Sequence, residues 1–462
     1  GKITYIDPRA AGTAMKATRY WPIRPGTDYA LNLGIIHTVL RDKLYDGEFV
    51  RQWVLGLKEL ESFVIPYTPE WAAGETGIPA DEIVEFTHEI AADRPAVIFH
   101  PGWMMARYSD SFYSIRTNYI LNALMGAFET PGGLFFQKGP GDVGAKGLKS
   151  LLDTIPKPED KRVDGCGWKY KHFDAGPGLL HLLYPAIVSE DPYPVKAYIA
   201  FRHDPLLSLP DPEAQKEAFD KLDLVVAIDA NYSETGWYAD VLLPSATYLE
   251  KSSVLTTGKG LKPQFGMRKQ AVEPRNDAKA DWWIFKSLAE RLGAGEYFKF
   301  KDMEEFWEWQ LEDTGITVSD LEKKGSVALT DKPVWWNRMK DLKFKTPSKK
   351  IEFVSSRLEA SGIESFKPYE CPKKPDEGYY RLAFGRSPVH THGRTQNNPV
   401  LSEIMPENQL WLNDEEAAKL GIAKGDRVRV TSADGSHSGT INVYVTEFIH
   451  PESVFMVHGF GR

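Results

Sequence analysis

The fold class is decided by DLVVAIDANYSETGWYADVLLPSATYLEK, residues 223–251. Two short apolar runs, DLVVAIDA and ADVLLPSA, have the length and β-branched content of buried strands. A third predicted strand, VKAYIAF (195–201), and a predicted helix, EAQKEAFDKL (213–222), precede them, and DWWIFKSLAERLG (281–293) follows with helical spacing. Because strands alternate with helices, this part of the chain predicts a parallel, doubly wound α/β sheet.

The same alternation occurs nearer the N-terminus. ITYI (3–6) and AVIFH (96–100) are predicted strands, whereas residues 29–45, 79–95 and 115–128 have helical spacing. The stretch from Ser62 to Glu75 is rich in Pro and aromatic residues and predicts a loop, and residues 137–178 predict a second, longer one. We therefore expect two Rossmann-like α/β units in this chain.

The last part of the chain has a different pattern. From Tyr379, five short alternating runs, RLAFGRS, QLWLN, DRVRVTS, GTINVYV and SVFMVHG, are separated by turn residues. They predict a mostly β module that forms a small barrel. The predicted domains are residues 1–107 (α/β), 108–330 (α/β), 331–376 (linker) and 377–462 (β module).

Composition excludes several classes of protein. The formal net charge of -8 argues against a nucleic-acid binder, which normally carries a clustered basic face. No uncharged apolar run reaches the roughly 18 residues of a membrane span. Cys166 and Cys371 lie far apart without CxxC spacing, so this chain alone does not hold a zinc knuckle or an iron–sulfur cluster.

Both ends of the sequence are abrupt. GKITYIDPR begins as a strand without an initiator Met or a preceding turn, and SVFMVHGFGR ends just after a predicted buried strand. We expect the chain to be a fragment or one part of a divided subunit.

Loops at the carboxyl ends of the predicted strands are the candidate ligand sites, because α/β sheets bind ligands there. Asp7 follows ITYI, and Asp28 ends the loop PGTD. An Asp at such a position can accept two N–H groups from a guanine edge, and Gly26 allows close approach of the backbone. For Asp7-Pro8-Arg9 alone, an Asp-capped turn is the simpler interpretation.

Further candidates follow other strands. Asp229 ends a strand where a nucleotide would lie, and Lys251 could neutralise a phosphate, although a single Lys is usually solvated. The loop 385–398, GRSPVHTHGRTQNN, combines Arg, His and small residues in a way that suits a polyanionic ligand. A metal site at His390 and His392 is the alternative, but no third ligand is evident.

The set and order of these motifs resemble the dimethyl sulfoxide reductase family of molybdenum enzymes. The matching motifs are YIDPR, WPIRPGTDYAL, HPGW, LNALMGAFETPGG, VVAIDANYSETGWYADVLLPSATYLEK, AKADWW, FGRSPVHTHGRTQNN and LNDEEAAKLGIAKGDRVRV. The resemblance covers residues 1–462 and is greatest to the catalytic subunits of polysulfide and thiosulfate reductases. It implies a double-psi type of β-barrel, here truncated, and molybdenum or tungsten held by two molybdopterin guanine dinucleotides.

The resemblance also implies roles for individual residues. One guanosine would be held by Asp7, Pro8, Arg9, Gly26, Thr27 and Asp28, with Asp28 the strongest candidate, and the other nucleotide by Ile228, Asp229, Lys251 and Asp281. The pterins would be crossed by Gly385, Arg386, Ser387, Val389, His390, Thr391, His392 and Gly393. Gly102, Trp103 and Arg107 match the loop that approaches the metal. Arg107 is the candidate catalytic residue for an anionic substrate, and an ordinary salt bridge is the alternative.

Two features of the family are not found here. Its 4Fe–4S segment and its protein ligand to the metal lie before the DPR motif, and Cys166 does not match either position. The chain alone is therefore expected to be inactive. The resemblance implies reduction of polysulfide or thiosulfate, with electrons supplied by an iron–sulfur subunit and a membrane quinone-reactive subunit, in the periplasm. Alternatives are a formate dehydrogenase, an arsenate reductase or a metal-free scaffold subunit.

Overall fold

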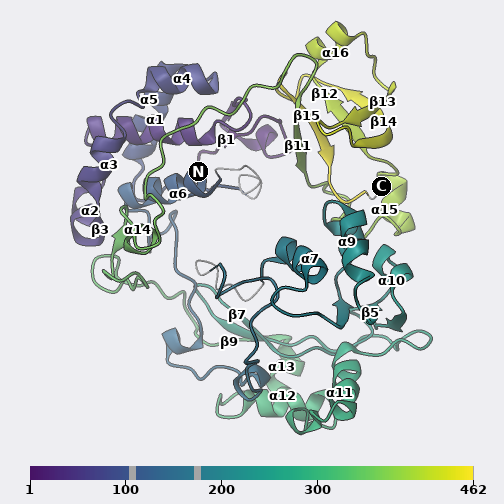
Figure 1. The fold of residues 1–462 in the computed structure, drawn as a ribbon. Coiled ribbons are helices and arrows are strands. Elements are labelled where there is room, and N and C mark those ends of the chain that lie inside the picture. The colour runs from purple at the N-terminus through teal and green to yellow at the C-terminus, as the bar shows by residue number, and fades with distance from the viewer. Residues whose placement is uncertain (103–110, 171–177, 461–462) are drawn as a thin grey trace. The chain divides into compact units, whose positions relative to one another are not determined.

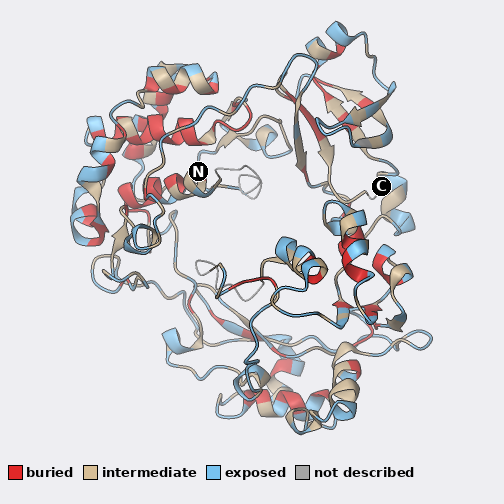
Figure 2. Cartoon of the chain, viewed as in Figure 1, coloured by how far each residue is buried: buried red, intermediate tan, exposed pale blue. Residues whose placement is uncertain are grey.

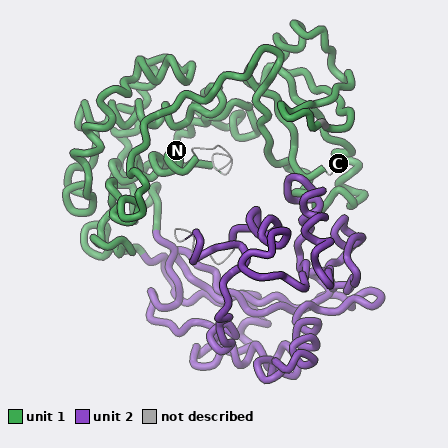
Figure 3. Tube along the Cα trace, in the orientation of Figure 1, with its two compact units in different colours: residues 1–135, 335–462 green, residues 136–334 purple. Residues whose placement is uncertain are grey.

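The computed structural model describes residues 1–102, 111–170 and 178–460. Two compact units make up the chain, residues 1–135 with 335–462 and residues 136–334 (Figure 3). These units cross the predicted domain ranges. Helix α6 (Ser111–Leu124) was predicted to belong with residues 108–330, but it packs on α1 (Asp28–Arg41) in the first unit. Two hydrogen bonds hold α6 against α1. The amide nitrogen of the buried Asn32, on α1, donates to the Ser114 carbonyl and to the Thr117 hydroxyl.

Helix α1 forms the centre of the helical layer of the first unit. Nearly all of its residues are buried, which is expected of a helix enclosed on all sides by α4, α5 and α6 (Figure 2). Gly34 permits a close approach of α1 to α4, because a Cβ there would lie 2.6 Å from the Cβ of Ala72 on α4. The predicted helices at 29–45, 79–95 and 115–128 are thus confirmed.

Further elements of the first unit are short (Figure 1). They are β1 (Thr4–Ile6), η1 (Ala14–Lys16), β2 (Arg19–Trp21), α2 (Gly47–Trp53), β3 (Val54–Leu55), α3 (Leu57–Phe63), α4 (Pro69–Thr76), α5 (Ala80–Ala92), β10 (Ile351–Glu352) and α14 (Ser356–Glu359). Strands β1 and β2 pair in parallel, as do β3 and β10.

The strand predicted at residues 96–100 does not form. Its backbone is bonded by a side chain instead: Phe99 N donates to the Asn122 amide oxygen (3.0 Å), and the Asn122 amide nitrogen donates to the Phe99 carbonyl (2.8 Å). Asn122 is fully buried on α6, so this extended segment is attached to a helix rather than to a neighbouring strand.

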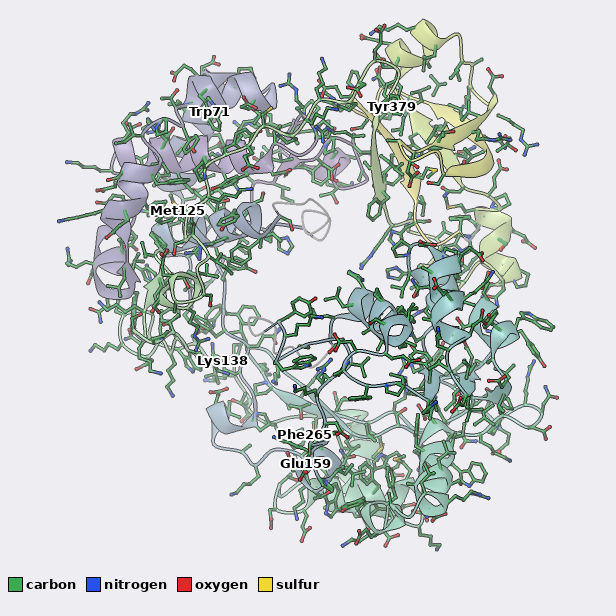
Figure 4. The ribbon with its side chains drawn as sticks, in the orientation of Figure 1. Trp71, Met125, Lys138, Glu159, Phe265 and Tyr379 are labelled. Atoms are coloured by element: carbon green, nitrogen blue, oxygen red, sulfur yellow. The ribbon has the colours of Figure 1, made fainter. Side chains whose placement is uncertain are left out.

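The prediction of a loop from Ser62 to Glu75 is also wrong. Helix α3 continues to Phe63, and α4 begins at Pro69 after Thr68, whose hydroxyl accepts from Trp71 N. Proline is tolerated at the first helical position, so the Pro-rich composition was misleading. The aromatic residues are core contacts: Trp71, labelled in Figure 4, packs edge-on against Tyr369 at 5.1 Å.

The predicted C-terminal β module is confirmed as a five-stranded mixed sheet. Its order is β11-β15-β12-β14-β13, with β11/β15 and β12/β14 parallel and β12/β15 and β13/β14 antiparallel. Its elements are β11 (Arg381–Gly385), α15 (Pro399–Ile404), β12 (Gln409–Leu412), α16 (Asp414–Leu420), β13 (Arg427–Thr431), β14 (His437–Val445) and β15 (Ser453–Val457).

The second unit contains the predicted α/β sheet, β4-β5-β6, which is entirely parallel. A separate antiparallel sheet, β7-β8-β9, packs fully buried Phe265 (Figure 4) against helices α12 and α13. The elements are η3 (Pro140–Val143), η4 (Leu151–Asp153), α7 (Leu180–Ser189), β4 (Ala197–Phe201), α8 (Pro205–Ser208), α9 (Pro212–Phe219), β5 (Leu224–Asp229), α10 (Glu234–Tyr238), β6 (Val241–Pro244), β7 (Thr256–Gly258), β8 (Gln264–Gly266), α11 (Asp281–Arg291), η5 (Gly295–Tyr297), α12 (Met303–Leu311), α13 (Val318–Lys324) and β9 (Ser326–Ala328).

Together these elements make a mixed α/β fold with parallel sheets and a C-terminal mixed sheet, as predicted. Among the described helices, none has both the length and the apolarity needed to cross a membrane.

Candidate functional site: a large cavity in the first unit

A cavity of about 1370 Å³ lies within the first unit. It is larger than the roughly 300–1,000 Å³ typical of small-molecule sites, so it can hold a ligand of dinucleotide size. Its wall includes seven of the predicted site residues, namely Asp7, Pro8, Arg9, Asp28, Gly102, Gly385 and Arg386. The first unit therefore brings together residues from both ends of the chain.

Asp7 lies directly after β1 and is held by its neighbours. Its carboxylate accepts from Arg9 N (2.8 Å) and from the Tyr5 hydroxyl (3.0 Å). Tyr20 donates to the Asp7 carbonyl at 3.1 Å. Burial raises the pKa of Asp7 above its usual 3.8, and the bonds from Arg9 N and Tyr5 oppose this shift only in part.

The raised pKa of Asp7 predicts a pH dependence of stability. The folded chain holds the Asp7 proton more tightly than the unfolded chain does, so the stabilising contribution of this group is full below pH 3.8 and is lost as pH rises through the folded pKa. We expect Asp7→Asn to remove this loss. The free energy of unfolding of both proteins without bound nucleotide is measured with urea between about pH 4 and 7. The value for the variant should rise relative to that of the wild type as pH rises. An unfolding free energy of the variant that falls relative to that of the wild type as pH rises would contradict the prediction.

Arg9 connects the N-terminal segment to the β module. Its guanidinium lies 3.9 Å from the ring centroid of Phe455 and 5.1 Å from that of Trp411, a cation–π arrangement. Its backbone forms an antiparallel bridge with Ile449. Burial lowers the pKa of Arg9, but a guanidinium stays charged in proteins. Arg9 is thus a fixed positive charge in the cavity wall.

The PGTD loop forms a tight turn directly before α1. Gly26 has φ of 82°, which favours glycine, and buried Thr27 precedes the first residue of α1. The Thr27 hydroxyl donates to the Arg24 carbonyl at 2.7 Å, which fixes the turn. Asp28 then lines the cavity at the start of α1. Gly26 and Thr27 support this turn without themselves lining the cavity.

Gly102 is the last residue that the structure describes before residue 111. Gly102 N donates to His100 Nδ1 at 3.0 Å, and both residues line the cavity. Trp103 and Arg107, the latter predicted to be catalytic, lie outside the described residues.

Of residues 385–398, only Gly385, the last residue of β11, and Arg386 line the cavity. Gly385 is needed for close packing, because a Cβ there would lie 3.0 Å from the Phe455 ring. The other predicted residues of this loop, Ser387, Val389, His390, Thr391, His392 and Gly393, do not line the cavity. The Ser387 hydroxyl folds the loop by accepting from Val389 N at 2.9 Å.

The two histidines of this loop do not form a paired metal site. His390 Nε2 is 2.9 Å from the Met405 carbonyl, whereas His392 Nδ1 is 2.8 Å from His458 Nε2. His392 also has φ of 52°, which is not the backbone conformation of a strand. Among the described residues, no group of three His, Cys, Asp or Glu could hold a metal ion.

Four other predicted residues, Ile228, Asp229, Lys251 and Asp281, belong to the second unit. Ile228 is buried at the end of β5, and the Asp229 carboxylate accepts from Ala230 N at 2.7 Å. Lys251, which is 8% exposed, forms an ion pair of 3.0 Å with Asp281 at the start of α11. The predicted nucleotide-binding roles of all four remain predictions.

This ion pair predicts an asymmetric effect of substitution. Asp281→Asn leaves a buried ammonium without its counter-ion and should cost about 1–2 kcal/mol of unfolding free energy. Lys251→Met should cost less, since Met fills the space and the Asp281 side chain, 25% exposed, stays hydrated at a helix N-terminus. Urea unfolding of both variants measures the difference. Equal losses of unfolding free energy in the two variants would contradict this prediction.

Two further wall residues, Arg381 and Ser453, were not predicted as site residues from the sequence. Alternation along β11 could have indicated Arg381, since it lies four residues before Gly385 and thus on the same face. Ser453 carried no such signal. The wall also fits a guanine dinucleotide chemically, because Asp7 and Asp28 can accept guanine N–H groups and Arg9 can donate to phosphate.

Comparisons with known proteins agree with this fold. The molybdopterin oxidoreductase family matches residues 1–291, and the molybdopterin dinucleotide binding domain matches residues 380–462. The thiosulfate reductase molybdopterin-containing subunit PhsA of Salmonella typhimurium is 33% identical over 100% of this chain and 64% of its own length. A formate dehydrogenase alpha subunit of Methanocaldococcus jannaschii is 28% identical over 98% of this chain and 67% of its own length.

A solved structure shows the same fold. The acetylene hydratase from Pelobacter acetylenicus matches with a TM-score of 0.85 and 26% identity, covering 99% of this chain and 66% of the other. The chain thus spans just under two thirds of PhsA and of this hydratase. Because the family match covers more than half of the residues, this chain belongs to the molybdopterin oxidoreductase family, with a molybdopterin dinucleotide binding domain at residues 380–462.

Proposed function

We propose that this chain works in the catalytic subunit of a molybdenum or tungsten bis(molybdopterin guanine dinucleotide) enzyme that reduces a sulfur compound such as thiosulfate or polysulfide. The observation that carries the proposal is the 33% identity to a thiosulfate reductase subunit along the whole chain. The cavity supports it, because Asp7, Arg9 and Asp28 form a wall suited to a guanine dinucleotide.

The residues of the chain would bind and orient the dinucleotide and the substrate. Asp28 would accept the N–H groups of one guanine, and Arg9, fixed over Phe455, would donate to a phosphate oxygen. When bound, the metal centre supplies two-electron redox chemistry. Reduction of thiosulfate takes two electrons and two protons, breaks the S–S bond and yields sulfite and hydrogen sulfide. Arg107 remains our candidate for holding the anionic substrate.

The proposal extends to partners. We expect a 4Fe–4S cluster close to the metal, an iron–sulfur subunit that delivers electrons and a membrane quinone-reactive subunit. We expect the assembly to lie in the periplasm. Purification of the native complex with identification of its subunits, after separation of periplasm from cytoplasm, tests all of these expectations.

The decisive experiment uses the protein isolated from its source. Molybdenum, tungsten and released pterin are measured first, and sulfide release from thiosulfate and from polysulfide is then followed with a reduced dye. Sulfide release that depends on the metal supports the proposal. A protein that holds metal and pterin but releases no sulfide would contradict the substrate, and the same sample would then be tested with formate and arsenate. A protein without metal or pterin would be a scaffold.

A second candidate is hydration of a small unsaturated molecule. It is favoured by the TM-score of 0.85 to an acetylene hydratase over nearly the whole chain. Hydration involves no net electron transfer. Consumption of acetylene without oxidation of the dye would therefore separate this reaction from sulfur reduction.

A further inference from the structure

One face of the β11/β15 pair forms part of the cavity wall. The two strands are parallel, with Arg381 opposite Ser453 and Ala383 opposite Phe455. Side chains opposite each other in a sheet point to the same face, so these four residues share one surface. All four line the cavity.

Arg381 and Ser453 each carry a buried polar atom without a hydrogen-bond partner in the described part of the chain. These atoms are Arg381 Nε and Ser453 Oγ, and Ser453 has no exposed surface at all. A buried donor left unsatisfied is costly, so such groups are rare unless they have a partner that is not part of the chain. Two of them opposite each other on one cavity wall indicate a ligand.

The charge of Arg381 narrows the chemistry of that ligand. One guanidinium nitrogen donates to the Lys373 carbonyl, but no carboxylate of the described residues forms an ion pair with Arg381. Lys2 and Arg19, by contrast, both pair with Glu89 on the same cavity wall. Since a guanidinium can only donate and Ser453 can donate as well, the shared partner must be an acceptor. An anionic oxygen satisfies both donors and balances the charge.

We propose that Arg381 and Ser453 form a binding subsite for an oxyanion group, donating from Arg381 Nε and Ser453 Oγ to its oxygens. The group is either a phosphate of the bound dinucleotide or a free sulfur oxyanion such as thiosulfate. The second source rests on the proposed function, whereas the first needs only the dinucleotide binding domain.

The test compares holoenzyme preparations of Arg381→Gln and Ser453→Ala with the wild type. The matched control is Arg429→Gln, because Arg429 is an exposed Arg of the same β module and does not line the cavity. Ser453→Ala removes only an unsatisfied hydroxyl, so it should keep or raise the melting temperature, which shows that the fold is intact. Two readouts are taken from each preparation: dinucleotide per chain, from released pterin and guanosine monophosphate, and the dissociation constant for sulfite.

Loss of one charge-assisted bond should weaken binding about ten- to a hundredfold. If the group is a dinucleotide phosphate, dinucleotide per chain falls in Arg381→Gln and more mildly in Ser453→Ala. If it is a free oxyanion, dinucleotide content stays constant and the dissociation constant for sulfite rises instead. The proposal is overturned if both readouts in both variants equal those of Arg429→Gln. A wild type that binds sulfite or dinucleotide but releases no sulfide from thiosulfate refutes the proposed function alone.

Discussion

Asp28→Asn should lower the dinucleotide bound per chain about ten- to a hundredfold. Asp28 lines the cavity at the first position of α1, where its carboxylate can accept two N–H groups from a guanine edge. Asn keeps the size of the side chain but replaces one accepting oxygen with a donor, so that a favourable charged contact becomes a repulsive one. Released pterin and guanosine monophosphate per chain measure the loss.

The control for this substitution is Asp414→Asn. Asp414 is also the first residue of a helix, α16, but it is exposed and lies outside the cavity wall. Loss of its charge removes only the favourable interaction with the helix N-terminus, worth about 0.3–1 kcal/mol. If both variants keep the wild-type dinucleotide content, Asp28 does not bind the nucleotide.

Gly459→Ala should be the most destabilising of these substitutions, at about 3–5 kcal/mol. Gly459 has φ of 90°, and a Cβ there would lie 2.4 Å from the carbonyl carbon of His392 and 2.7 Å from Gly393 N. These are backbone atoms, so the loop after β11 must move to relieve the overlap. Urea unfolding followed by tryptophan fluorescence measures the loss of stability.

Gly435→Ala isolates the backbone part of this effect. Gly435 has φ of 88° in the turn between β13 and β14, but a Cβ there would meet no atom within 4 Å. This variant should therefore lose only the roughly 1–2 kcal/mol of a left-handed alanine. Equal losses at the two positions would show that the loop yields freely and that Gly459 does not constrain it.

The strand-end loops were the part of the site that the sequence could predict. Asp7, Asp28 and Gly385 were identified because each lies in a loop that follows a predicted extended segment, and the structure places all three in the lining of one cavity. Local patterns also predicted α1, the β4-β5-β6 sheet and the five strands of the β module. These features depend on residues close in sequence, whose periodicity and turn chemistry are visible without a structure.

Long-range partners could not be predicted in the same way. Residues 96–100 have the composition of a strand, but Asn122 binds their backbone from a helix. The segment from Ser62 to Glu75 has the composition of a loop, but its aromatic side chains pack against a segment about 300 residues away and so form core helices. Local composition indicates which secondary structure a segment prefers, and at these two segments tertiary packing overrides that preference.

The α/β class, the β module and the loops that carry polar residues at strand ends were predictable from the sequence, because these features follow from local spacing and turn chemistry. The set of residues that share one cavity wall depends instead on tertiary contacts. Arg9 meets Phe455, and Arg381 lies opposite Ser453, because chain segments from the two ends pair within one compact unit. Such contacts depend on strand register and packing between distant segments, which no local pattern encodes.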